Sequence, residues 1–153
     1  STDITFKIVS KTTGWLGFGL SPNGGMKNSD MILTWSKSDG TTEFKDAHTE
    51  GSTKIFYDSV QNWQKLYYSQ ANGMTTVIFT RKLKICNPNQ PAQEININVE
   101  PTSYVIWAWG NGEPSYHESN RGSKSLPLLG ALNQKINLDM SQVEIIEYET
   151  KVR

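Results

Sequence analysis

The chain has few of the residues on which most catalytic centres depend. It contains one cysteine and two histidines among 153 residues. It also lacks a Gly-x-Ser-x-Gly nucleophile elbow, a phosphate-binding glycine loop and a His-Glu-x-x-His zinc motif. These absences give little support to a catalytic centre within this chain.

A surplus of charge of either sign is also missing. Fifteen basic side chains balance fifteen acidic ones, and no basic stripe stands out along the sequence. Binding to nucleic acid depends on such a stripe, so we expect no nucleic-acid partner. No apolar run approaches the length of a membrane span, so we expect no membrane-spanning segment.

The single cysteine, Cys86, has no partner within the chain, so an internal disulfide is excluded. It is either a small apolar residue of the core or half of a disulfide to another chain or segment. The sequence has no Asn-x-Ser/Thr glycosylation site. Neither feature identifies a cellular compartment.

Short apolar runs separated by turn residues dominate what is present. In residues 4–9, Ile4, Phe6 and Ile8 alternate with polar or smaller residues, which is the period of a strand. Similar runs cover residues 15–20, 31–35, 74–81 and 104–109, and Asn-Gly or Asp-Gly turns stand between several of them. No segment has sustained helical periodicity. The pattern predicts one all-β domain, an antiparallel β-sandwich.

The run at residues 15–20, WLGFGL, differs from the others because glycines occupy one of its faces. Trp15, Gly17 and Gly19 share that face, and the leucines and Phe18 share the other. Glycines inside a strand indicate a close approach by a ligand or another backbone. The Gly-rich turn that follows presents Met26, whose thioether is a soft metal ligand.

Four segments resemble the DOMON domain, most nearly the N-terminal DOMON domain of DBH-like (MOXD-type) copper monooxygenases. They are GWLGFGLSPNGGMKNSDMILTW at 14–35, EFKDAH at 43–48, TRKLKIC at 80–86 and YVIWAWGNGEPSYHESNRGSKSLPLL at 104–129. The resemblance implies an immunoglobulin-like β-sandwich over residues 1–130 in a secreted or lumenal protein. Residues 131–153 would then be a last strand or a linker towards a C-terminal region.

The same resemblance implies a non-catalytic ligand-binding or assembly domain of a copper monooxygenase-type protein. The copper centres of that family need several histidines and a methionine, so with two histidines copper is not expected in this chain. The resemblance also implies a disulfide from Cys86 to a part of the protein outside this chain.

A second hypothesis is a cytochrome module that transfers electrons through haem b. Haem-binding DOMON domains use a methionine after the Gly-Trp strand and a histidine from a later loop, and Met26 and His117 match these positions. Thioether and imidazole together suit six-coordinate iron. The alternative is structural, with Met26 capping the core and His117 bonded to Arg121 or a loop carbonyl. The flat apolar surface for a porphyrin would come from four aromatic residues, Trp15, Phe18, Trp107 and Trp109.

The resemblance also implies a hard-cation site for calcium or sodium. Its ligands would be the Asp30 side chain, the Met31 and Ala47 carbonyls and Asn62. Asn62 stands where an acid is usual in the family, which weakens divalent binding unless Asp46 or Asp58 compensates. The alternative is that Asp30 caps a turn.

A third hypothesis is a stand-alone sugar-binding or interaction protein. Five tryptophans are many for a chain of this length, and aromatic faces stack on sugar rings. Tryptophans of a β-sandwich are otherwise core residues, so their exposure decides between the two.

Overall fold

The computed structural model describes residues 2–85, 95, 97, 103–126, 128 and 143–152. The described part contains ten strands and no helix, and so no helix with the length and apolar character needed to cross a membrane. The strands are β1 (Thr2–Ser10), β2 (Trp15–Ser21), β3 (Asp30–Ser36), β4 (Thr42–Thr49), β5 (Ile55–Tyr57), β6 (Gln64–Ala71), β7 (Met74–Lys82), β8 (Ser103–Gly110), β9 (Arg121–Leu126) and β10 (Val143–Val152).

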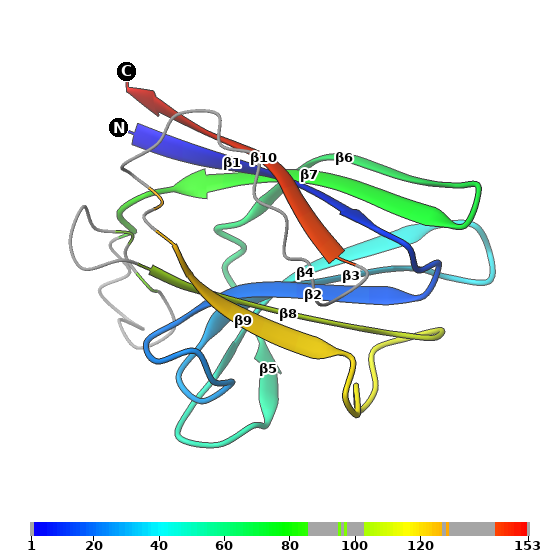
Figure 1. Ribbon diagram of the computed structural model, residues 1–153, viewed down its shortest axis with the longest axis horizontal. Coiled ribbons are helices and arrows are strands. Elements are labelled where there is room, and N and C mark those ends of the chain that lie inside the picture. Colours follow the sequence, from blue (N-terminus) through cyan, green and yellow to red (C-terminus); the bar gives the residue numbers. More distant parts are fainter. Residues whose placement is uncertain are drawn as a thin grey trace.

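The strands form two sheets that face each other across the core (Figure 1). One sheet has four strands in the order β10-β1-β7-β6, and the other has six in the order β5-β4-β3-β2-β8-β9. Every pair of neighbouring strands is antiparallel. The predicted all-β antiparallel sandwich is therefore confirmed.

The space between the sheets is filled by aromatic rings. Phe6 of β1 meets Phe18 of β2, with ring centroids 4.9 Å apart, and both contact Trp63 and Phe79. All four side chains are essentially inaccessible to solvent. Removal of one such ring from a packed core costs about 3–5 kcal/mol, so this cluster is a main source of stability.

The two faces of β2 have different surroundings, as its sequence predicted. Leu16, Phe18 and Leu20 belong to the core cluster between the sheets. Gly17 and Gly19 face the outside of the six-stranded sheet, and Ala108 of β8 lies directly beside Gly17. This outer face therefore has a strip without projecting side chains.

The chain ends in β10, which pairs with β1, so the two chain ends lie side by side (Figure 1). β10 falls within the segment 131–153, for which a last strand or a linker was expected. Residues 131–142 lie outside the described part of the chain. Cys86 and its expected disulfide also lie outside it.

Candidate functional site

An open cavity of about 980 Å³ lies against the outer face of the six-stranded sheet. Its floor includes Gly17 and Gly19 of β2 and Ala108 of β8. Aliphatic side chains of the neighbouring strands surround this strip, namely Met31, Leu33, Ile55 and Ile106. The cavity is as large as the clefts that hold cofactors, and its floor is apolar and smooth.

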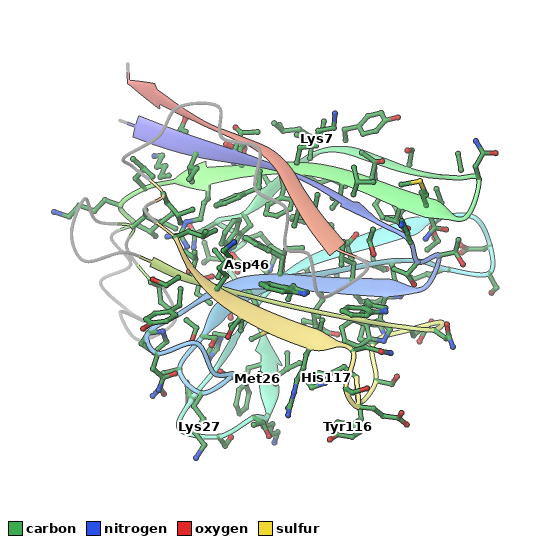
Figure 2. The ribbon with its side chains drawn as sticks, viewed as in Figure 1. Lys7, Met26, Lys27, Asp46, Tyr116 and His117 are labelled. Carbon is green, nitrogen blue, oxygen red and sulfur yellow. The ribbon has the colours of Figure 1, made fainter. Side chains whose placement is uncertain are left out.

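Two loops from opposite ends of the sheet close the sides of the cavity. The segment 22–29 follows β2, and the segment 111–120 follows β8, which runs antiparallel to β2. Met26 from the first loop and His117 from the second both line the cavity. Figure 2 shows both below the six-stranded sheet, on the side away from the four-stranded sheet. The structure thus brings together the two residues that the sequence singled out for haem.

The loop that carries Met26 is held by hydrogen bonds from side chains to backbone. Ser21 Oγ donates to the Gly25 carbonyl at 2.6 Å and accepts from the Gly24 N–H at 2.9 Å. Thr49, at the end of β4, donates its hydroxyl to the Met26 carbonyl. These bonds fix the backbone beside Met26 from two strands.

The ring of His117 is oriented by its own loop. Its Nδ1 lies 3.0 Å from the Glu118 carbonyl, and the His117 carbonyl accepts from the Asn120 N–H at 2.8 Å. A carbonyl accepts only from a protonated nitrogen, so this contact places the proton on Nδ1 and the lone pair on Nε2. Within the described residues Nε2 has no hydrogen-bond partner. Neutral imidazole held in this way is the usual form of a histidine metal ligand.

The other histidine, His48, is not available to a ligand. It is buried, and its two ring nitrogens contact the carboxylates of Asp58 and Glu50. Burial alone would lower the pKa of His48, but the hydrogen bonds and charges of these two acids outweigh it and raise that pKa. Of the two histidines, His117 is therefore the one whose ring keeps a nitrogen without a partner among the described residues.

Tyr57 of the edge strand β5 contributes a phenol to the cavity lining. Burial raises the pKa of Tyr57, and the nearby charges of Glu113 and Glu43 raise it further. The phenol therefore stays neutral at physiological pH and keeps a proton to donate.

Asp30, the side chain proposed for a hard cation, lies inside the sandwich. It is fully buried, and Arg81 of β7 donates to its Oδ2 at 2.5 Å. Trp63 Nε1 donates to Oδ1 at 2.7 Å, and the Ile95 N–H donates to Oδ2 at 3.0 Å. Both carboxylate oxygens are thus engaged by protein donors, and a cation there would have to share them.

The remaining three residues of the predicted cation site lie on adjoining segments. Met31 and Ala47 stand opposite each other in β3 and β4. The Asn62 N–H donates to Asp46 Oδ2 at 2.6 Å, which places Asn62 beside the residue that precedes Ala47. In the part of the chain that the structure describes, no group of three or more His, Cys, Asp or Glu side chains is arranged to hold a metal. The hard-cation site stays a prediction.

The tryptophans are almost all withdrawn from solvent. Trp15, Trp35, Trp63 and Trp107 are each less than one tenth exposed. Trp109 is half-buried, packs against the core cluster and is absent from the cavity lining. Their burial counts against stacking on a sugar. Trp15, Phe18 and Trp107 nevertheless line the cavity, so three of the four aromatic residues expected to form a porphyrin surface lie at it, together with the glycines and aliphatic side chains.

Sequence reasoning missed Arg81 as the partner of Asp30, although a signal for it exists. Val77 and Phe79 are buried and Arg81 continues their alternation along β7. A basic residue at an inward position needs a buried acid, because an unpaired buried charge is costly. That pattern would have predicted a buried acid as the partner of Arg81, but not which of the buried acids it is.

Solved structures with the same fold include two cytochrome domains. The cytochrome domain of Myriococcum thermophilum cellobiose dehydrogenase matches 82% of this chain and 66% of that domain, with a TM-score of 0.57 and 17% identity. The cytochrome b domain of pyranose dehydrogenase from Coprinopsis cinerea matches 80% of this chain and 67% of that domain, with a TM-score of 0.57 and 15% identity. At these identities the likeness establishes the fold.

The relatives found by sequence are DBH-like monooxygenase proteins, whereas the solved structures above are cytochrome domains. DBH-like monooxygenase protein 1 of Homo sapiens is 34% identical over 134 residues, which are 84% of this chain. This chain spans about a fifth of the length of that relative, 21%. The family model for the DOMON domain matches residues 1–110, well over half of the sequence. The chain therefore belongs to the DOMON domain family.

Proposed function

We propose that this domain binds haem b in the outer-face cavity, where Met26 and His117 would hold the iron, and that the haem would carry single electrons. One observation supports this most strongly. A methionine and a histidine from loops at opposite ends of the sheet line the same cavity, and the histidine has a free Nε2. Of the three functions that the sequence suggests, this arrangement supports the cytochrome module best.

The fit of the cavity supports a porphyrin in three respects. Its volume of about 980 Å³ is sufficient for a large cofactor. Its floor of Gly17, Gly19 and Ala108 is smooth and apolar, as the surface of a planar macrocycle requires. The described part of its lining contains no aspartate or glutamate that would compete for the iron.

The residues of this chain would hold and orient the group and exclude water from it. Thr49 and Ser21 fix the loop that presents the Met26 thioether, and the Glu118 carbonyl keeps the proton of His117 on Nδ1. The aliphatic walls lower the local polarity, which raises the reduction potential together with thioether ligation. Haem supplies the reversible one-electron chemistry, and the protein supplies the two ligands and the apolar surroundings.

We further propose that the domain is a non-catalytic part of a larger, copper monooxygenase-type protein of the secretory pathway. The similarity to DBH-like monooxygenase protein 1, of which this chain spans 21%, supports this proposal. In such a protein the copper centres would lie outside this chain, and the domain would bind a ligand or a partner domain.

Reconstitution with haemin tests the proposal. We expect a Soret band typical of six-coordinate low-spin haem, and its loss or conversion to high spin in Met26→Ala and His117→Ala. Met74→Ala is the matched control for methionine, since Met74 lies at the exposed start of β7, away from the cavity. A wild-type protein that stays colourless after reconstitution would refute haem binding.

A hard cation at Asp30, Met31, Ala47 and Asn62 is the second candidate. It is supported by the adjacency of Met31 and Ala47 and by the buried carboxylates of Asp46 and Asp58 nearby. Calcium and sodium both take such oxygen ligands.

A further inference from the structure

Two cationic side chains line the cavity without a counter-charge. Lys27 follows Met26 in the first loop, and Arg121 begins β9. Neither forms a hydrogen bond through its side chain or an ion pair with any residue that the structure describes. Elsewhere in the described part Lys37, Lys45 and Arg81 are all paired with carboxylates.

The register of the sheet fixes the side of the sheet on which Arg121 lies. Arg121 stands directly opposite Ala108, the small residue of the cavity floor. Opposed residues of an antiparallel pair project to the same face. The Arg121 side chain therefore projects from the cavity side of the sheet, next to Ala108.

Lys27 approaches from the opposite end of the sheet. Its loop follows β2, whereas Arg121 follows the loop that carries His117. Figure 2 shows Lys27 farther from the six-stranded sheet than Met26, and both residues line the cavity. Lys27 thus comes to the cavity from the end of the sheet that carries Met26, and Arg121 from the end that carries His117.

The positive charge of the cavity lining does not reflect the charge of the whole chain. The whole chain carries fifteen basic and fifteen acidic residues and has a formal net charge of zero. Among the described residues, the cavity lining nevertheless contains Lys27 and Arg121 and no acid. A neutral ligand would leave both charges unmatched, whereas an anionic one would pair with them.

We infer that Arg121 and Lys27 form a carboxylate-binding subsite, so that the ligand of this cavity is a planar apolar molecule that carries carboxylates. The inference rests on the proposed function, because haem b has two propionate groups. It adds that these groups, besides the iron, determine which macrocycle binds. Arginine pairs with a carboxylate through two parallel N–H donors, and lysine adds a point charge.

Metal-free porphyrins test the subsite independently of the axial ligands. The full chain is titrated with protoporphyrin IX and with its dimethyl ester, in the same detergent, and binding is followed by porphyrin fluorescence. We expect the diacid to bind at least about tenfold more tightly at low salt. This preference should shrink as salt is added, because the cations are exposed and salt screens them.

Substitution then assigns the preference to the two side chains. Arg121→Gln and Lys27→Gln should each reduce the preference for the diacid by roughly three- to tenfold and leave the affinity for the diester unchanged. Lys124→Gln, on the same strand as Arg121, and Lys11→Gln are matched controls, since neither residue lines the cavity.

The outcomes separate this inference from the proposed function. Equal affinity for diacid and diester, together with normal haemin binding, overturns the subsite and leaves the haem proposal standing. A preference that survives both substitutions also overturns it. Failure of both porphyrins and of haemin to bind overturns the subsite and the haem proposal together.

Discussion

Asp30 and Met26 lie four residues apart in the sequence, and the structure gives them opposite surroundings. Asp30 is fully buried, and both of its carboxylate oxygens accept hydrogen bonds from the protein. Met26 is half-buried, and it lines an open cavity together with His117. A buried carboxylate such as that of Asp30, whose partners all come from the protein, stabilises the fold. A pair of ligating atoms without a hydrogen-bond partner among the described residues is instead what the proposed ligand requires.

The largest effect on stability is expected from removing the carboxylate of Asp30. Asp30→Ala leaves the Arg81 guanidinium buried without its counter-charge, since both side chains of the pair are inaccessible to solvent. We expect a loss of about 3–5 kcal/mol in the free energy of unfolding, measured by urea denaturation. Asp39→Ala is the control, because Asp39 accepts hydrogen bonds from Thr41 in an exposed turn. Equal losses in the two variants would contradict the structural role of Asp30.

A larger side chain in the cavity tests whether the site lined by Met26 and His117 binds the porphyrin. Ala108→Leu adds a side chain above the smooth floor, where the cavity has room for it. We expect the affinity for protoporphyrin IX to fall at least tenfold, about 1.4 kcal/mol, with little change in stability. Fluorescence titration and thermal melting measure the two quantities. Ala71→Leu, at the exposed end of β6, is the control. Unchanged binding in Ala108→Leu would place the porphyrin elsewhere.

A smaller effect should follow from loosening the Met26 loop without touching Met26. Thr49→Val keeps the shape of the side chain but removes the hydroxyl that donates to the Met26 carbonyl. We expect a loss of about 1 kcal/mol in stability and a larger high-spin fraction after haemin reconstitution. Thr42→Val, on the same strand, removes a hydroxyl that contacts only the exposed Lys65 amine among the described groups. If Thr49→Val and Thr42→Val have the same spectrum as the wild type, Met26 is positioned by other contacts.

The smallest effect concerns the predicted hard cation. Asn62→Asp restores the acid that is usual in the family, so it should strengthen calcium binding near Met31 and Ala47. We expect millimolar calcium to raise the stability of this variant by no more than about 1 kcal/mol, roughly 2–4 °C in Tm. Excess chelator should reverse the shift. A calcium response absent from both the wild type and Asn62→Asp would remove the cation hypothesis.

The strands and their faces were predictable because the signal for them is local. Alternation in residues 4–9 and the glycines of residues 15–20 depend on side chains two residues apart. The inward set Ile4, Phe6 and Ile8 is buried as this period requires. Turns with Asn and Gly are local in the same way, and Asn72 and Gly73 have positive φ between β6 and β7.

The meeting of Met26 with His117 could be proposed from the family pattern but not worked out from the residues. Ninety-one positions separate the two residues in the sequence. Their meeting depends on two irregular loops that fold over one sheet face from opposite ends. The pairing of Asp30 with Arg81 depends on contact between the two sheets. Local periodicity carries no information on either arrangement.

The backbone around Gly19 has a consequence for tracing how such cavities evolve. A Cβ on Gly19 would lie 2.7 Å from the Asp30 carbonyl and 2.7 Å from the Met31 Cβ. The neighbouring strand alone therefore forbids a side chain there, with or without a ligand. A descendant that no longer bound anything would still retain this glycine. If a descendant lost the ligand, we expect substitutions to accumulate first at Ala108, whose side chain faces the cavity.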